Sequence, residues 1–234
     1  MAEVSSTGRQ EVLIPFDGDR LLADLTVPSG AQGIVLFAHG SGSGRRSPRN
    51  RAVAEVLQRQ GIATLLLDLL TAEEAREDER NLSYRFQIPF LGDRLVAAVD
   101  WVLADPLLGS LRIGLYGAST GGAAALLAAA ARPQKVRALV LRGARSDLAA
   151  ESYLRVKAPT LLLVGGRDPP ILEVARETSR RLAAPHSTTI IPQATHLFEE
   201  PGALEAVAQG TADWFRRYLT EGPPPAAAPQ RKPE

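Results

Sequence analysis

Short apolar runs recur along this chain, and each is followed by a longer amphipathic segment. The apolar runs are GIVLFA (33–38), ATLLLDL (63–69), RIGLYG (112–117), ALVLRG (138–143), TLLLVG (160–165) and STTIIP (187–192). Runs of this kind are too apolar for a half-exposed strand and suit a parallel sheet buried on both faces. The amphipathic segments are RAVAEVLQRQG, RLVAAVDWVLAD, the Ala-rich stretch after Ser119, ILEVARETSRRLA and ALEAVAQGTADWFRRYL. This alternation predicts an α/β fold with a doubly wound, mostly parallel sheet flanked by helices.

Three segments depart from the strand and helix alternation. Near the start, EVLIPF and LLADLTV are separated by Asp17-Gly18-Asp19, a pattern typical of a hairpin with an Asp-Gly turn. Residues 71–90 are first charged and then aromatic, and we expect a long loop there. The tail GPPPAAAPQRKPE is rich in Pro and Ala and predicts an extended, disordered end. We therefore expect one domain over residues 1–221 and a disordered tail over residues 222–234.

Composition removes several classes of function. The 27 basic and 26 acidic residues give a formal net charge of +1, which provides no electrostatic footprint for nucleic acid or an anionic membrane. The chain has no cysteine, so disulfides, thiolate metal sites and a cysteine nucleophile are excluded. The opening MAEVSSTGRQ lacks the apolar core of a signal peptide, and no apolar run reaches membrane-spanning length. We expect a cytoplasmic enzyme or binding protein.

A candidate nucleophile follows the RIGLYG run. Gly117-Ala118-Ser119-Thr120-Gly121 matches G-x-S-x-G between an expected strand and an expected helix. A nucleophile elbow requires this context, because the serine occupies a strained turn and small neighbours let the helix pass close to the strand. The start of the helix also favours developing negative charge. The pattern predicts Ser119 as the nucleophile.

The chain offers three histidines as a general base. His39 ends the GIVLFA run, where a hydrogen-bonded structural imidazole is expected. His186 precedes STTIIP and belongs at the opposite, amino edge of the sheet. His196 follows STTIIP, at the carboxyl edge where open α/β sheets place their sites. Elimination leaves His196.

The acid that orients the base should also lie at a carboxyl edge. Asp168 does, directly after TLLLVG and before the next helix. Asp68, at the end of ATLLLDL, and Asp147, beyond ALVLRG, are rivals that could instead cap a helix or a turn.

The order Ser119, Asp168, His196 reproduces the order of the α/β hydrolases. The chain resembles that superfamily over nearly its whole folded length, and most closely its small dienelactone-hydrolase-like members. The matching pieces are HGSGS after a strand, GASTGG at the elbow, GGRD after the penultimate strand and ATH after the last one. The resemblance implies an α/β-hydrolase fold. Only RSDLAAESYLRVK separates ALVLRGA from Ala158, so we expect no cap domain.

The glycine-rich stretch HGSGSGRRS could in principle bind a phosphate. A P-loop requires G-x-x-x-x-G-K-[ST], but His39 stands where its first glycine should be and Arg45 replaces its lysine. By resemblance the stretch is an oxyanion loop in which the Ser41 backbone N–H is one donor to the oxyanion. The resemblance implies that the second donor is the N–H of Thr120, the residue after the nucleophile. Substitution of Arg45 or Arg46 is then expected to have little effect. The resemblance calls for neither a metal nor an organic cofactor.

The activity expected from these residues is hydrolysis of a small-molecule carboxylic ester or lactone through an acyl-enzyme on Ser119. Residues 71–90 could form a partial lid, with Tyr84, Arg85 and Phe86 lining the site. Arg85 or Arg145 could pair with a substrate carboxylate, or either could be a solvated surface residue. The archetypal dienelactone hydrolases use cysteine, so a serine at this position does not imply dienelactone as substrate. An acyltransferase or perhydrolase with the same triad, and a non-catalytic binding protein on the same fold, remain alternatives.

Overall fold

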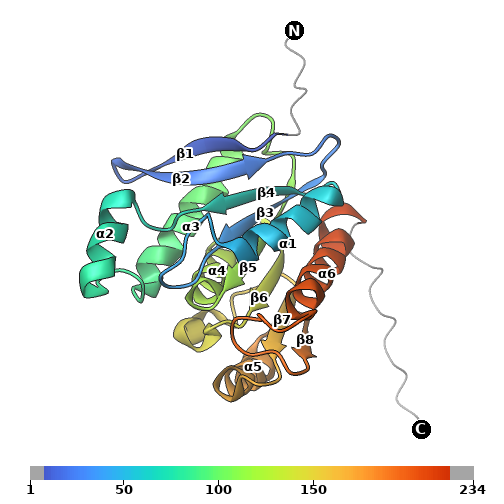
Figure 1. Cartoon of the computed structure of the whole chain (residues 1–234). Helices are drawn as coiled ribbons and strands as arrows, with labels where there is room; N and C mark the ends of the chain where they lie inside the picture. Colours follow the sequence, from blue (N-terminus) through green and yellow to red (C-terminus); the bar gives the residue numbers. More distant parts are fainter. Residues whose placement is uncertain (1–7, 222–234) are drawn as a thin grey trace.

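A computed structural model describes residues 8–221 and contains one eight-stranded sheet with the strand order β1-β2-β4-β3-β5-β6-β7-β8 (Figure 1). The strands are β1 Gln10–Phe16, β2 Asp19–Thr26, β3 Gly33–Ala38, β4 Ala63–Leu67, β5 Arg112–Ala118, β6 Val136–Arg142, β7 Thr160–Gly165 and β8 His186–Ile191. β1 and β2 form the predicted hairpin, β2 pairs antiparallel with β4, and all other neighbours are parallel. The predicted doubly wound α/β fold is confirmed.

Helices cover both faces of the sheet (Figure 1). They are α1 Pro48–Arg59, α2 Ala72–Asn81, α3 Ile88–Ala104, α4 Thr120–Ala131, α5 Pro169–Arg181 and α6 Ala203–Phe215, with the short elements η1 Ser146–Ser152 and η2 Arg216–Thr220. One core joins α3 and α4 to the sheet, and a second joins α1 and α6 to the opposite face. The strands between them are buried throughout: every residue of β3, β4 and β7 is inaccessible to solvent or nearly so.

Two expectations about local structure were wrong. Residues 71–90 are not one long loop, because α2 occupies half of them. Its first turn has a capping box in which Thr71 accepts the Glu74 N–H and Glu74 accepts the Thr71 N–H, so the charged stretch is a capped surface helix. STTIIP is not buried on both faces either. It forms β8 at the edge of the sheet, where the polar residues of the strand are exposed.

The connection from β6 to β7 contains η1, and the fold has no cap domain there. No helix within residues 8–221 is long and apolar enough to cross a membrane. The tail predicted over residues 222–234 lies outside the described residues, and its disorder stays a prediction. The single domain expected over residues 1–221 stays a prediction as well.

Candidate active site

Ser119 lies in a strained turn between β5 and α4. Its backbone has φ 51° and ψ −122°, a conformation that side-chain-bearing residues rarely adopt. Three backbone hydrogen bonds hold this turn: the Ser119 N–H donates to the Arg142 carbonyl at 3.1 Å, and the Ser119 carbonyl accepts N–H groups from Gly122 and Arg145, each at 3.0 Å. Strand β6 therefore anchors the elbow from the side.

Glycines make the turn possible because other elements approach its backbone closely. A Cβ at Gly121 would overlap the carbonyl oxygens of Ala38 and His39, and a Cβ at Gly122 would overlap the Cβ of Ala144. The start of α4 thus packs directly on the end of β3, without an intervening side chain.

His196 and Asp168 reach Ser119 from the loops after β8 and β7. His196 Nε2 lies 3.2 Å from Ser119 Oγ, and His196 Nδ1 lies 2.6 Å from Asp168 Oδ2. The Asp168 side chain is nearly buried, whereas the imidazole is more than one-third exposed. In the neutral tautomer that suits these contacts, Nδ1–H donates to the carboxylate and Nε2 accepts the serine proton.

The structure places the rival residues elsewhere. Asp68 pairs with Arg45, and Asp147 forms an exposed ion pair with Arg145. The buried His39 imidazole hydrogen-bonds on both sides, as expected for a structural residue. His186 begins β8 and bonds the Ala184 carbonyl. Of the candidate acids and bases, Asp168 and His196 are the pair that meets Ser119.

The glycine-rich loop lies beside the serine. A Cβ at Gly40 would be 3.1 Å from the Ser119 Cβ, so the loop and the elbow are in contact. Among the loop and turn hydrogen bonds within residues 8–221, the N–H groups of Ser41 and Thr120 have no backbone acceptor. A cavity of about 250 Å³ opens next to them. Residues 40–43, Leu70, Leu91, Thr120 and residues of α2 contribute to its wall. The two free N–H donors therefore border a space that can hold a small ligand.

Comparison with known proteins identifies the family. The sequence model of the dienelactone hydrolase family matches residues 23–220. This chain belongs to the dienelactone hydrolase family. A dienelactone hydrolase from Anabaena variabilis is 53% identical, with a TM-score of 0.89 over 91% of this chain and 98% of that one.

Other relatives differ in length or are more distant. A curated Mycobacterium tuberculosis protein, provisionally named a phosphoribosyl transferase, is 52% identical over 202 residues, which cover 86% of this chain and 44% of that protein. The chain thus spans less than half the length of this curated relative. Est1E from Butyrivibrio proteoclasticus shares the fold, with a TM-score of 0.73 at 18% identity over 88% of this chain and 97% of Est1E.

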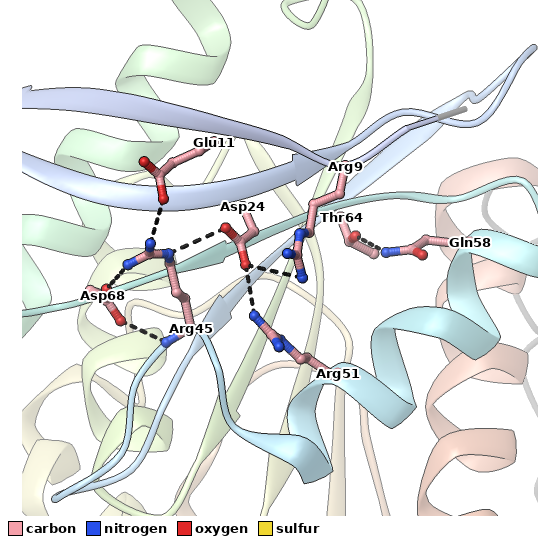
Figure 2. Close-up of polar contacts among 8 residues, drawn as sticks. All are labelled: Arg9, Glu11, Asp24, Arg45, Arg51, Gln58, Thr64 and Asp68. Carbon is pink, nitrogen blue, oxygen red and sulfur yellow. Dashed lines mark hydrogen bonds and ion pairs between the residues drawn. The ribbon is translucent and has the colours of Figure 1, made fainter. Parts of the chain in front are cut away.

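Arg45 has a structural position that the sequence analysis missed. Its side chain is buried and contacts three carboxylates: Asp68 at 2.6 Å, Asp24 at 3.2 Å and the largely exposed Glu11 (Figure 2). Asp68 Oδ1 also accepts the Arg45 backbone N–H at 2.7 Å. The expectation that Arg45 substitution has little effect therefore needs correction. Arg46 is exposed, and the small effect expected for its substitution stays a prediction. No short motif indicates these contacts, because they join the loop to β1, β2 and the end of β4.

The other end of the loop is held by the residue after Asp68. The Leu69 N–H donates to His39 Nε2 at 2.9 Å, and His39 Nδ1 bonds the Gly40 carbonyl at 2.9 Å. Burial lowers the pKa of His39, although the bond to Gly40 and the charge of Asp68 oppose this effect. His39 is thus kept neutral, and the two residues after β4 hold both ends of the glycine-rich loop.

A buried arginine on α3 extends this network to α2. Arg94 Nη1 donates to the Leu69 carbonyl at 2.8 Å, and its guanidinium forms two short bonds with Glu74. The Phe90 ring lies 4.0 Å from the guanidinium carbon. Hydrogen bonds therefore run from α2, which borders the cavity, through Leu69 to the glycine-rich loop.

Of the four expected substrate-binding residues, Arg85 alone borders the cavity beside Ser41. Tyr84 donates to Glu77 and packs against Phe90, Phe86 is mostly exposed, and Arg145 is paired with Asp147. These three residues do not line this cavity, and their part in substrate binding stays a prediction. Arg85 binds the buried Asp78 through Nε at 2.6 Å, and its Nη1 would lie 3.3 Å from a Cβ at Gly42.

Asp78 organises this part of the wall. Burial alone would raise its pKa, but N–H groups of Tyr84 and Arg85 and the Arg85 guanidinium lower it below the usual range. Asp78 is therefore ionised and fixes Arg85 over the glycine-rich loop. Within residues 8–221, no group of three or more His, Cys, Asp or Glu side chains could hold a metal ion.

Proposed function

We propose that the protein is a serine hydrolase that cleaves a small carboxylic ester or lactone through an acyl-enzyme. The observation that carries this proposal is the continuous contact from Ser119 Oγ to His196 Nε2 and from His196 Nδ1 to Asp168. A base within hydrogen-bonding reach of the nucleophile, itself oriented by a carboxylate, is the arrangement that activates a serine.

In the acylation step, Ser119 Oγ attacks the carbonyl carbon while His196 Nε2 takes the serine proton. Asp168 stabilises the imidazolium that forms and keeps Nδ1–H directed toward itself. The negative charge on the carbonyl oxygen is met by the N–H groups of Ser41 and Thr120. The tetrahedral species then collapses, and the leaving alkoxide takes the proton from His196.

Deacylation repeats these steps with water. His196 removes a proton from water, whose oxygen attacks the acyl carbon, and the proton then passes to Ser119 Oγ as the carboxylic acid leaves. An alcohol or peroxide in place of water would give acyl transfer or perhydrolysis through the same residues. We propose water as the acyl acceptor. Product analysis with competing alcohol or peroxide measures directly how much acyl-enzyme goes to hydrolysis and how much to acyl transfer or perhydrolysis.

Arg85 supports a preference for substrates with an anionic group. Its Nε and Nη2 bond Asp78, whereas Nη1 faces the glycine-rich loop beside the cavity. A substrate carboxylate could accept from this remaining donor while its carbonyl lies against the Ser41 N–H. The small cavity favours compact substrates over long acyl chains.

The test combines a covalent probe with a substrate screen. A fluorophosphonate should label the wild-type protein and fail to label Ser119→Ala, while Ser43→Ala, an exposed serine on the neighbouring loop, should label normally. p-Nitrophenyl esters of rising chain length and small lactones then define the substrate.

Absence of labelling in a folded wild-type protein would favour a binding protein without turnover. Turnover of a phosphoribosyl donor without ester hydrolysis would contradict the proposal.

A further inference from the structure

Arg142 is a buried cation without a carboxylate partner. It ends β6 directly beside the elbow, and 8% of the residue is exposed. Within residues 8–221 its Nε and Nη1 are buried without a hydrogen-bond partner, and the side chain pairs with no carboxylate. Its guanidinium carbon lies 5.8 Å from the centre of the Phe198 ring. An uncompensated buried charge is costly, because it loses the hydration it has in water.

Two further unpartnered donors lie on the same side of the sheet. Tyr116 on β5 is fully buried, and its hydroxyl has no partner within the described residues. The strand register places Arg142 opposite Ala118, two residues beyond Tyr116, so both side chains project into the core that α1 and α6 cover. The Nε of Arg49, in the first turn of α1, is the third buried donor without a partner.

The loop that follows His196 brings the two arginines together. Phe198 lies over Arg142, and the next residue, Glu199, forms a 3.0 Å ion pair with Nη1 of Arg49. Both cations also act on Tyr116: burial raises the pKa of its hydroxyl, and the charges of Arg142 and Arg49 oppose that rise. Arg142 and Arg49 are therefore both close enough to act on the buried Tyr116 hydroxyl, and both contact the segment that follows His196.

The unpartnered atoms in this group are complementary to an anion. The guanidinium nitrogens can only donate hydrogen bonds, and the tyrosine hydroxyl can donate one. An anion accepts from all of them and neutralises the buried charge.

We propose that Arg142, Tyr116 and Arg49 form a binding site for a small monovalent anion of the halide class. The anion supplies the counter-charge of Arg142 and thereby stabilises the Phe198–Glu199 segment that follows His196. The site is separate from the ester-hydrolysis chemistry and does not depend on the proposed function.

The experiment uses the full chain in sodium chloride or bromide, with sodium gluconate keeping the ionic strength constant. The melting temperature should rise by about 4 °C for each tenfold increase of halide above its Kd. Crystals soaked in bromide should show an anomalous peak within contact distance of the Arg142 guanidinium and the Tyr116 hydroxyl.

Variants locate the effect. Arg142→Met should abolish the halide dependence and, in gluconate, be at least as stable as wild type, because it removes an unpaired buried cation. Arg137→Met, an exposed arginine on the same strand, should keep the wild-type response. Tyr116→Phe, a smaller change, should raise the halide Kd by about tenfold through loss of one donor.

Two results would overturn the inference. One is an equal halide response in wild type and in both site variants. The other is bromide-soaked crystals with no anomalous peak between Arg142 and Tyr116.

Discussion

The two walls beside Ser119 are held in different ways. On one side, the elbow is fixed by backbone contacts among neighbouring residues, with glycines at 117, 121 and 122 allowing β5, α4 and β3 to touch. On the other side, the glycine-rich loop is fixed by charged side chains that come from β1, β2 and the end of β4. The elbow thus depends on the absence of side chains, and the loop depends on particular ones.

This difference shows that one site can combine a strained, closely packed turn with a loop held by several ion pairs. Steric contacts at the elbow leave no room for substitution, whereas the ion pairs of Arg45 divide the support of the loop among several partners (Figure 2). We expect a substitution at the elbow to cause a large loss of stability or activity. Substitutions around the loop should each cause a smaller, partial loss.

The largest expected effect separates two aspartates that both follow parallel strands. Asp168→Asn should lower kcat for ester hydrolysis by about 10⁴-fold with little change in melting temperature, because the amide favours the wrong imidazole tautomer. Asp147→Asn should leave kcat close to wild type, since Asp147 pairs with Arg145 at the surface. The reverse outcome would assign the orienting acid to Asp147.

Gly121→Ala tests the steric side of the site. The added methyl overlaps two carbonyl oxygens of β3 and the residue after it, so we expect a loss of about 3 kcal/mol or more in unfolding free energy. Gly210→Ala in α6 is the matched control: its Cβ would meet Leu163 at an ordinary 3.6 Å, and stability should hold or rise slightly. Denaturant unfolding measures both, and equal stabilities would refute the steric account.

Ser41→Pro removes one proposed oxyanion donor. We expect kcat to fall about a hundredfold, because the Ser41 N–H is lost. Ser41→Ala keeps that N–H and should retain most of the activity. Circular dichroism and melting temperature must match wild type before the loss is interpreted, and an inactive Ser41→Ala would assign the role to the side chain instead.

Arg45→Met tests the charged support of the loop. Loss of the guanidinium removes one partner of the buried Asp24, which keeps Arg51, and we expect a decrease of about 2 kcal/mol in unfolding free energy. The kcat should fall about tenfold with little change in KM, since the loop shifts and the cavity remains. Arg46→Met, on the exposed neighbour, should match wild type in both respects. A stable, fully active Arg45→Met would mean that the backbone alone positions the loop.

The smallest effect concerns pH. Because burial lowers the pKa of His39, the unfolded chain takes up a proton that the folded chain refuses. Stability from this residue is present above the ordinary histidine pKa of about 6.5 and is lost as pH falls below it. His39→Gln should flatten the decline of melting temperature between about pH 7 and 5. His186→Gln, at an exposed position, should leave that decline unchanged, and an unaltered slope in His39→Gln would exclude His39 as its source.

Local patterns in the sequence predicted the strands that form the sheet, the elbow and the members of the triad. Buried strands and the G-x-S-x-G turn are encoded in consecutive residues, and the carboxyl edge of a parallel sheet brings the ends of β5, β7 and β8 together. Ser119, Asp168 and His196 could therefore be selected from their positions after strands, and the structure brings them into contact. Their catalytic roles remain the proposal made above.

Only the tertiary structure decided the roles of the arginines. Arg45 and Arg46 are adjacent in the sequence, yet one is buried among carboxylates 21 to 34 residues away and the other is exposed. Three other arginines also differ in their surroundings. Arg85 is held over the cavity, Arg94 supports α2, and Arg142 lacks a counter-charge. Propensity and periodicity act over a few residues, whereas the partner of a long charged side chain depends on which distant elements pack beside it. Sequence alone therefore located the three side chains that we propose to react, and three-dimensional packing determined which charges lie around them.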